Sequence, residues 1–218
     1  MTLQEIYNRV VWYVYGDSTP PASVATYLQG ANGAIARAHY EIMSGWNYWF
    51  MEEETTQAIT SGTSAYNLPA RFKKEIALRL YDLTNLVYKN PLTRIGRGDA
   101  YYKYLDDADS TEYPTVYEIW DGQIVLKPEP STNSTLYIRY YQYLTGLVNL
   151  ADHDALTDNQ HGAEAIISRV VMDFASNIEY ADKYAPFSQR YSDAIRLLRE
   201  QDQEYKRYGQ DYIAYVGV

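Results

Sequence analysis

Residues 113–143 read YPTVYEIWDGQIVLKPEPSTNSTLYIRYYQY, and this stretch decides the fold of the chain. Two short runs near its start, Val116–Trp120 and Gln123–Lys127, are rich in residues that suit a pleated, half-buried surface. An Asp-Gly pair joins them, and this pair tolerates the positive φ angles that a two-residue type I′ turn requires. A Pro-Glu-Pro sequence stops the second run, and Leu136–Tyr143 then alternates between two faces. The stretch therefore predicts a three-stranded antiparallel meander.

Amphipathic patterns on both sides of this β region predict four helices. Apolar residues recur every three or four positions through residues 3–15, 22–43, 162–182 and 187–208. Thr2 and Glu5 have the spacing of a capping box, and Gly209 is placed to end the last helix. We expect an α+β fold: a four-helix bundle-like helical domain from both chain ends, an inserted antiparallel β region and an extended C-terminal tail.

The same patterns predict the domain boundaries. We expect residues 1–50 and 151–209 to form the helical bundle domain, residues 51–150 the inserted β domain, and residues 210–218 the extended C-terminal tail. A chain of 218 residues is long enough to bury a core without covalent cross-links.

The amino-acid composition of the chain excludes several classes of function. The chain has no cysteine, which excludes disulfides, thiolate metal sites and thiol nucleophiles. Its N-terminus has no basic region followed by a long apolar run, and no apolar stretch approaches the roughly 20 residues that span a membrane. We therefore expect a soluble protein that does not bind membranes.

Charge and tyrosine content point to protein partners. The formal net charge is −9, and general nucleic-acid binders need cationic groups to neutralise phosphates. Residues 70–103 nevertheless hold eight Lys or Arg and three acidic residues, either as a solvated face or as a surface for an acidic partner. Tyr occurs 25 times, against four Phe and four Trp. Because Tyr is enriched at interface cores, this predicts a protein that lies between other proteins.

The sequence contains none of the complete catalytic motifs considered next. The phosphate-binding loop, the H-E-x-x-H zinc motif and the G-x-S-x-G nucleophile elbow are all absent. One cluster has metal-ligating residue types, namely Asp152, His153, Asp154, Asp158 and His161. It lacks two His at i, i+4, so we interpret it as an acidic loop that caps the following helix; a hydrolase using this cluster is the competing hypothesis. We expect no catalytic residue, no metal site and no cofactor.

The order of landmark residues resembles a known family. A helix of small residues ends in Tyr40–Trp46, and the aromatic Asn47–Phe50 and the acidic Glu52–Glu54 follow it. Tyr66–Pro69, the basic Phe72–Leu80, the hairpin and the closing strand come next. This pattern resembles the head-to-tail adaptor proteins of tailed bacteriophages, including the tail tubular protein A or gatekeeper group of short-tailed phages. The resemblance covers most of residues 20–208.

The resemblance implies a structural role in the virion at the head-to-tail interface, after synthesis in the host cytoplasm. Such adaptors form a ring, usually of twelve copies, that docks under the portal protein and continues the DNA channel. The implied partners are the portal protein, neighbouring copies, and tail nozzle or tail fibre proteins, while viral DNA passes without sequence-specific binding. The alternative from the residues is a Tyr-rich β module that binds a ligand or glycan on a helical carrier.

Two sets of residues are candidate contact sites. The C-terminal QDYIAYVGV carries one charge and suits a strand laid on a partner's sheet edge, so we predict a portal interface at Tyr212, Ile213, Tyr215 and Val216. A tail folded onto its own bundle is the alternative. In the β region we predict an interface with tail proteins or neighbouring copies at Trp120, Asp121, Tyr137 and Tyr141.

Overall fold

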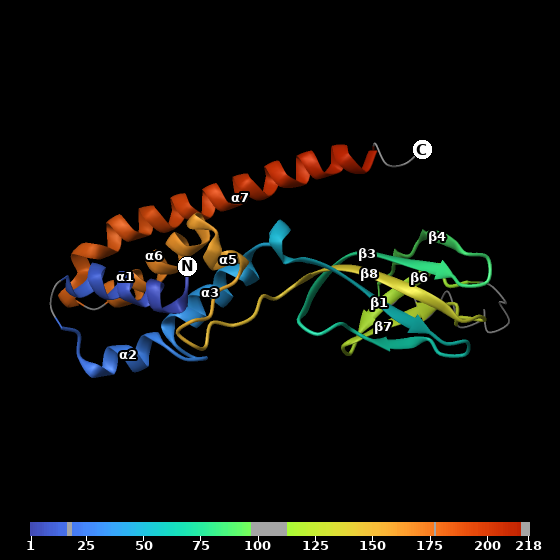
Figure 1. Ribbon diagram of the computed structural model, residues 1–218, viewed down its shortest axis with the longest axis horizontal. Helices are drawn as coiled ribbons and strands as arrows, with labels where there is room; N and C mark the ends of the chain where they lie inside the picture. The colour runs from blue at the N-terminus through green and yellow to red at the C-terminus, as the bar shows by residue number, and fades with distance from the viewer. Residues whose placement is uncertain (17–18, 97–112, 177, 215–218) are drawn as a thin grey trace. The chain divides into compact units, whose positions relative to one another are not determined.

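The computed structural model of the protein describes residues 1–16, 19–96, 113–176 and 178–214 (Figure 1). The chain divides into two compact units. One comprises Met1–Met51 and Leu144–Val218, and the other comprises Glu52–Tyr143. The first unit is helical and the second is built from strands.

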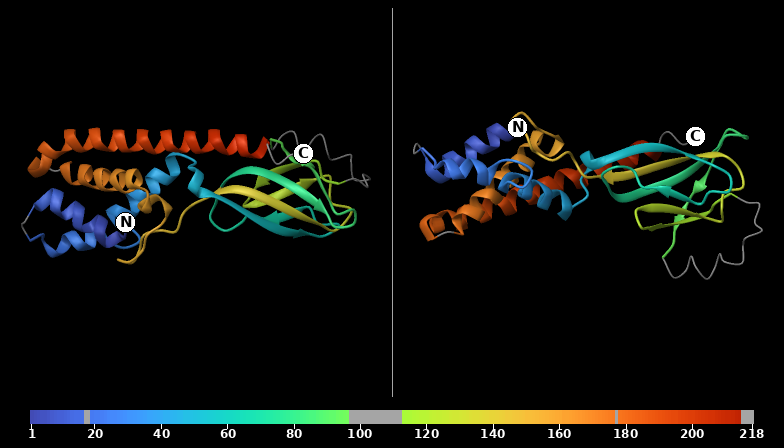
Figure 2. Two further views of the ribbon diagram at one scale, coloured as in Figure 1. Left: turned by 45° about the horizontal axis from the view of Figure 1, so that its top comes forward. Right: turned by 90° about the horizontal axis from the view of Figure 1, so that it is seen from below.

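The helical unit is organised around one central helix. Its elements are α1 (Leu3–Tyr15), α2 (Ala22–Leu28), α3 (Ala34–Gly45), the 3-10 turn η1 (Trp49–Met51), α5 (Ala155–Asp158), α6 (Gln160–Ala175), the 3-10 segment η2 (Ile178–Lys183) and α7 (Tyr184–Ala214). Helix α6 contacts α1, α3, α5 and α7 (Figure 2). A helix is buried on all sides only if small or apolar residues surround its axis. The sequence of α6 meets this condition over most of its surface, because Ala163, Ala165, Ile166, Val170 and Val171 are all buried, while Arg169 and Asp173 are partly exposed.

The predicted four-helix bundle is therefore wrong. The described residues form six α-helices, and α6 packs against neighbours on several sides rather than through one apolar stripe. The small residues Gly162 and Ala165 are buried with the large ones, which the stripe pattern did not take into account.

Three of the predicted helices also have different boundaries. The helix expected over residues 162–182 ends at Ala175, and the 3-10 segment η2 covers Ile178–Lys183. The helix expected over residues 22–43 is broken between α2 and α3, where Gly30 has a φ of 84° and Gly33 is the N-cap of α3. The helix expected to end at Gly209 continues to Ala214, so the extended C-terminal tail is wrong for the residues that the structure describes. A single Gly costs a helix only about 1 kcal/mol, which is too little to end a long one.

The β unit consists of two four-stranded sheets. Sheet A has the order β1 (Glu52–Ile59), β8 (Ser134–Gln142), β3 (Phe72–Asp82) and β4 (Val87–Pro91). Sheet B has the order β2 (Ala65–Asn67), β7 (Gln123–Lys127), β6 (Val116–Trp120) and β5 (Thr93–Arg94). One apolar cluster joins the two sheets, with Leu78, Leu80, Leu136 and Ile138 from sheet A and Ile124 and Leu126 from sheet B. The sheets thus form a sandwich whose core lies between them.

The predicted meander is wrong at its third strand. Strands β6 and β7 pair as an antiparallel hairpin, as expected, but β8 pairs with β1 and β3 in the other sheet. The region is also not purely antiparallel, because β5 and β6 are parallel. The sequence between Lys127 and Ser134 is long enough to cross from one sheet to the other, and the residues of a strand do not specify which edge it will join.

Local predictions that depend on backbone chemistry are confirmed. Asp121 and Gly122 both have positive φ, 49° and 72°, in the turn between β6 and β7. Thr2 and Glu5 form a capping box at the start of α1. On β8 the residues Leu136, Ile138 and Tyr140 are buried, as the alternation predicts.

Candidate functional site

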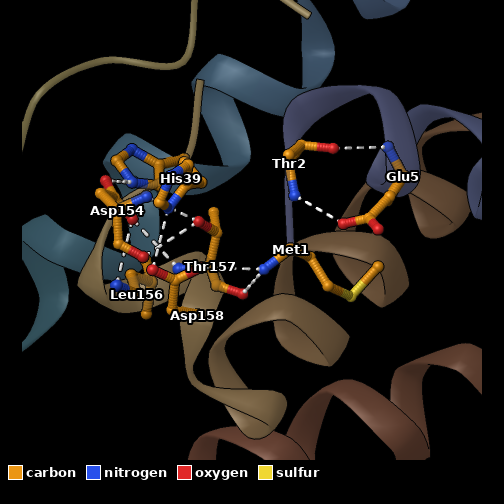
Figure 3. A network of polar contacts seen from close by, with 9 residues as sticks. Met1, Thr2, Glu5, His39, Asp154, Leu156, Thr157 and Asp158 are labelled. Atoms are coloured by element: carbon orange, nitrogen blue, oxygen red, sulfur yellow. Dashed lines mark hydrogen bonds and ion pairs between the residues drawn. The ribbon is translucent and has the colours of Figure 1, made fainter. Parts of the chain in front are cut away.

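Asp154, one member of the acidic and histidine cluster, caps a helix of the helical unit (Figure 3). Asp154 is the N-cap of α5, and its Oδ1 accepts hydrogen bonds from the backbone N–H groups of Leu156 at 3.1 Å and Thr157 at 3.0 Å. Its Oδ2 lies 2.6 Å from Nε2 of the buried His39. The Thr157 hydroxyl accepts from the Asp154 backbone N–H at 2.8 Å, which completes the capping box. Each oxygen of the Asp154 carboxylate therefore has a protein partner.

The other members of the cluster point to separate partners. Asp152 accepts from the backbone N–H groups of Asn149 at 2.7 Å and Val148 at 2.9 Å, and these bonds, Asn149 first, lower the pKa of its carboxyl. Asp158 pairs with His153 at 2.9 Å, and this contact is the main cause of its lowered pKa. His161 is the second residue of α6. In the described parts of the chain, no three His, Cys, Asp or Glu side chains are grouped to hold a metal ion.

A fully buried carboxylate on α7 ties the aromatic segment after α3 to the helical unit. Asp202 is 0% exposed and accepts hydrogen bonds from Trp46 Nε1 at 2.8 Å, the Trp49 backbone N–H at 2.7 Å and Lys206 Nζ at 2.8 Å. Lys206 also donates to the Asn47 carbonyl at 2.6 Å. The segment Trp46–Trp49 is thus fixed by one carboxylate, just before the chain leaves the helical unit.

The sequence gives no signal that distinguishes Asp202 from other acidic residues. It lies among the charged residues of α7, such as Arg199, Glu200 and Glu204, and no local pattern separates it from them. Its position opposite Trp46 depends on packing between segments that are 156 residues apart.

A second carboxylate organises the β3–β4 turn in the β unit. Asp82 accepts from the backbone N–H groups of Thr84 at 2.8 Å and Asn85 at 3.1 Å, and from the Tyr113 hydroxyl at 2.6 Å. Lys89 Nζ lies 3.1 Å away. The Tyr113 hydrogen bond is the largest cause that lowers the pKa of Asp82 well below its usual range, followed by the Asn85 side chain. The Asp-Leu-Thr-Asn sequence is a turn signal that could have identified this site.

The predicted interface residues of the β unit lie at two places. Trp120 is 52% exposed at the end of β6, and Asp121 follows it in the exposed turn. Tyr137 and Tyr141 are half-buried on the face of sheet A that points away from the sandwich core. The structure therefore does not join these four residues into one surface.

Tyr137 belongs to an aromatic cluster that crosses three strands. Its ring centroid lies 5.3 Å from that of Tyr88 on β4 and 6.4 Å from that of Tyr81 on β3. The Arg79 guanidinium stacks over the Tyr88 ring, 4.9 Å from its centroid. We call Arg79, Tyr81, Tyr88 and Tyr137 the outer aromatic cluster. Rings held in this way present a large, pre-ordered contact area.

A groove of about 510 Å³ opens beside β1 in the same unit. Its lining includes Glu53, Thr55 and Gln57 from β1, together with the segment Asn67–Arg71 and Gln142. Glu53, Thr55 and Gln57 pair with the buried Tyr140, Ile138 and Leu136, so they lie on the core side of sheet A although they are polar. At this edge the sandwich is open and hydrophilic.

The C-terminal candidate residues are only partly described. Tyr212 and Ile213 lie in the last turn of α7, while Tyr215 and Val216 lie outside the described residues. Among the helices that the structure describes, none is both long and apolar enough to cross a membrane.

Together these observations define a class of protein. The polar clusters serve caps, turns and packing, and the β unit exposes aromatic side chains and open sheet edges, as expected of a structural protein that contacts other proteins. The chain belongs to the SU10 adaptor protein family, whose family model matches residues 1–213. No curated protein matches the chain. The membership confirms the resemblance to phage head-to-tail adaptors: the protein is a bacteriophage structural adaptor, a component of the virion that interacts with other head or tail proteins.

Proposed function

We propose that the protein forms a ring in the head-to-tail connector, docks under the portal protein, continues the DNA channel and provides the attachment surface for tail nozzle or tail fibre proteins. The observation that carries this proposal is the family match over residues 1–213. The ring would hold twelve copies, the number that the resemblance implies. The chain would be made in the host cytoplasm and incorporated into the virion.

Charge supports a channel through which DNA slides. The formal net charge is −9, because 28 Asp or Glu outnumber 19 Lys or Arg, and such a chain repels phosphates on balance. Of the cations in residues 70–96, Lys89 pairs with Asp82 and Arg94 pairs with Glu75. The excess of acidic residues over the whole chain disfavours strong contacts to phosphates, so DNA would pass without sequence-specific binding.

The contact sites of this proposal are the two predicted sets. Residues 210–218, with Tyr212, Ile213, Tyr215 and Val216, would contact the portal protein, because this apolar sequence has one charge. Trp120 and Asp121 at the exposed turn would contact tail proteins, and Tyr137 and Tyr141 would contact a neighbouring copy. Deleting residues 210–218 should abolish portal binding and leave the melting temperature of the free chain nearly unchanged. Retained binding together with a large loss of stability would show that the segment belongs to its own fold.

The proposal is tested by complementation of a phage that lacks this gene. We expect such a phage to make DNA-filled heads without tails, and the supplied protein to restore tailed, infectious particles. The variant with both His153→Ala and His161→Ala should complement as well as the parent, because the function is assembly without catalysis. Failure of this variant despite normal folding and incorporation would support a metal or hydrolase role for the cluster. Tailed particles in the absence of the gene would contradict the adaptor role.

The groove beside β1 favours one alternative function. Its carboxylate, amide and hydroxyl groups can hydrogen-bond a polar ligand such as a glycan. This alternative predicts sugar binding by the free chain and loss of that binding in Gln57→Ala. The adaptor proposal predicts no sugar binding.

A further inference from the structure

Sheet A ends in two strands that each pair on one side. Strand β1 pairs with β8, and β4 pairs with β3, so among the described strands both outer edges are open. An open edge presents unpaired backbone N–H and C=O groups and is a template for another strand. In the ring proposed above, a neighbouring copy could cover these edges. The inference below rests on that ring.

The β4 edge is apolar and exposed. Leu86 is 69% exposed, Val87 45% and Tyr88 48%, on or next to an edge strand. Native edge strands are normally protected by charge, because exposed apolar edges invite association. Arg79 lies over this edge, since it stacks on Tyr88 and its Nε donates to the Lys89 carbonyl at 2.8 Å. The β4 edge thus combines apolar side chains with a cationic group.

The β1 edge is acidic. Glu52 is paired with Arg139 at 2.6 Å, and Glu53 accepts from Gln142 at 2.9 Å. Glu54 is exposed, and no ion pair or hydrogen bond joins its carboxylate to another described side chain. Two β1 edges brought together would place like charges side by side, which disfavours a symmetric contact. A β4 edge, with Arg79 beside it, has the complementary charge.

Strand directions make the two edges compatible. The four strands of sheet A are antiparallel to their neighbours, so β4 runs opposite to β1. If a second copy lies beside the first in the same orientation, its β1 is antiparallel to the β4 edge of the first. The faces also match, because Thr56 and Tyr88 lie on the outer face with Tyr137 and Tyr81, their respective cross-strand partners.

We propose that β4 of one copy pairs with β1 of the next, so that sheet A continues from copy to copy around the ring. Placing Thr56 opposite Tyr88 brings Glu54 to the segment 89–91, where the register of β3 and β4 shifts and Arg79 pairs with Pro91. Pro91 has no backbone N–H and ends the ladder there. The outer aromatic cluster is then covered at its β4 end. Because the two surfaces differ, the contact is heterologous and closes into a ring when the rotation per copy permits.

The first test uses the absence of cysteine from the native chain, which makes introduced thiols specific. Phage particles are assembled with Thr56→Cys, with Tyr88→Cys, with an equal mixture of both, or with the double variant, and are then oxidised. We expect no cross-link from either single variant, dimers from the mixture, and a ladder of multimers from the double variant. Glu129→Cys combined with Tyr88→Cys is the matched control and should give no ladder, because Glu129 is exposed in the same unit but lies off both edges.

The second test reverses the charges. Glu54→Arg and Arg79→Glu should each lower incorporation into particles about tenfold, since like charges opposed across an interface disfavour the contact strongly. The double reversal should restore incorporation, and Glu129→Arg should incorporate normally. The melting temperature of each variant shows whether it folds.

The outcomes separate this inference from the proposed function. Complete particles without the ladder, unaffected by Glu54→Arg, would overturn the edge pairing and leave the connector role intact. Cross-links from Thr56→Cys alone would show a symmetric contact and also overturn it. Complete tailed particles that do not contain the chain would overturn both.

Discussion

At the residue scale, the buried Asp202 holds the segment Trp46–Trp49 through two hydrogen bonds and is neutralised by Lys206. Asp202→Asn removes the charge that attracts Lys206 and leaves one oxygen for two Trp donors. Hydrogen bonds to charged groups contribute about 1.5–3 kcal/mol each, so we expect the free energy of unfolding to fall by about 2 kcal/mol. Urea denaturation followed by Trp fluorescence measures this loss.

Glu204→Gln is the matched control for that prediction. Glu204 is exposed on the same helix, and exposed substitutions usually change stability by less than about 0.5 kcal/mol. If Asp202→Asn is as stable as Glu204→Gln, the carboxylate does not hold the segment.

Asp82 predicts a dependence of stability on pH. Its pKa is lower in the folded protein than in the unfolded chain, chiefly because the Tyr113 hydroxyl donates to it. Its contribution is therefore complete above the ordinary carboxyl pKa of about 4 and is lost as the pH falls below that value toward the folded pKa. In Asp82→Asn this contribution is absent at every pH.

The stability difference between the parent and Asp82→Asn should thus be large at pH 7 and shrink between about pH 4 and pH 2. Urea unfolding curves at a series of pH values measure it. Asp121→Asn is the control, because Asn fits the same type I′ turn, and this variant should follow the parent. A difference that is constant down to pH 2 would contradict the role of the carboxylate charge.

At the element scale, the contact between α5 and α6 depends on the absence of a side chain at Gly162. A Cβ at this position would lie 2.6 Å from Leu156 Cδ1 and would also clash with the Leu156 carbonyl oxygen. The Leu156 side chain is fully buried, so it has little room to move. Gly162→Ala should therefore lower the free energy of unfolding by about 1–3 kcal/mol, the usual range for overpacking.

Gly146→Ala provides the comparison, because a Cβ there meets no atom within 4 Å. This change should be neutral or slightly stabilising, since Ala restricts the unfolded chain more than Gly does. Equal melting temperatures for the two variants would show that α5 is not packed as described.

Elements were predictable from sequence where local chemistry decides them. The capping box at Thr2 and the positive φ at Asp121-Gly122 are properties of a few neighbouring residues, and both were predicted correctly. The pairing of β8 with β1 and β3 was not, because alternation along a strand specifies its faces and not its neighbours. The length of α7 was also missed, since Gly209 was given more weight than its helix penalty justifies.

The candidate sites could likewise be predicted only where neighbouring residues in the sequence determine them. Exposure of Trp120 follows from its place beside a turn and could be predicted. The outer aromatic cluster could not, because it joins β3, β4 and β8 only once the register of sheet A is known.

At the scale of the whole molecule, the 25 tyrosines have more than one role. Burial raises the pKa of Tyr48 and of Tyr117 to about 12, and both are core residues. Tyr40, Tyr88, Tyr184 and Tyr205 are exposed. The number of tyrosines therefore overestimates how many of them lie at interfaces. Only the exposed tyrosines are available to contact partners.

The central proposal is that this adaptor assembles in a defined number on the portal protein. The most direct measurement is the mass of the portal complex, with the purified chain added in increasing amounts. Each bound copy adds 25.2 kDa. We predict that the mass rises to a plateau at one ring of twelve copies per portal, and that the chain alone at the same concentration stays below ring size. A portal mass that does not change, or one that rises without a plateau, would contradict the account.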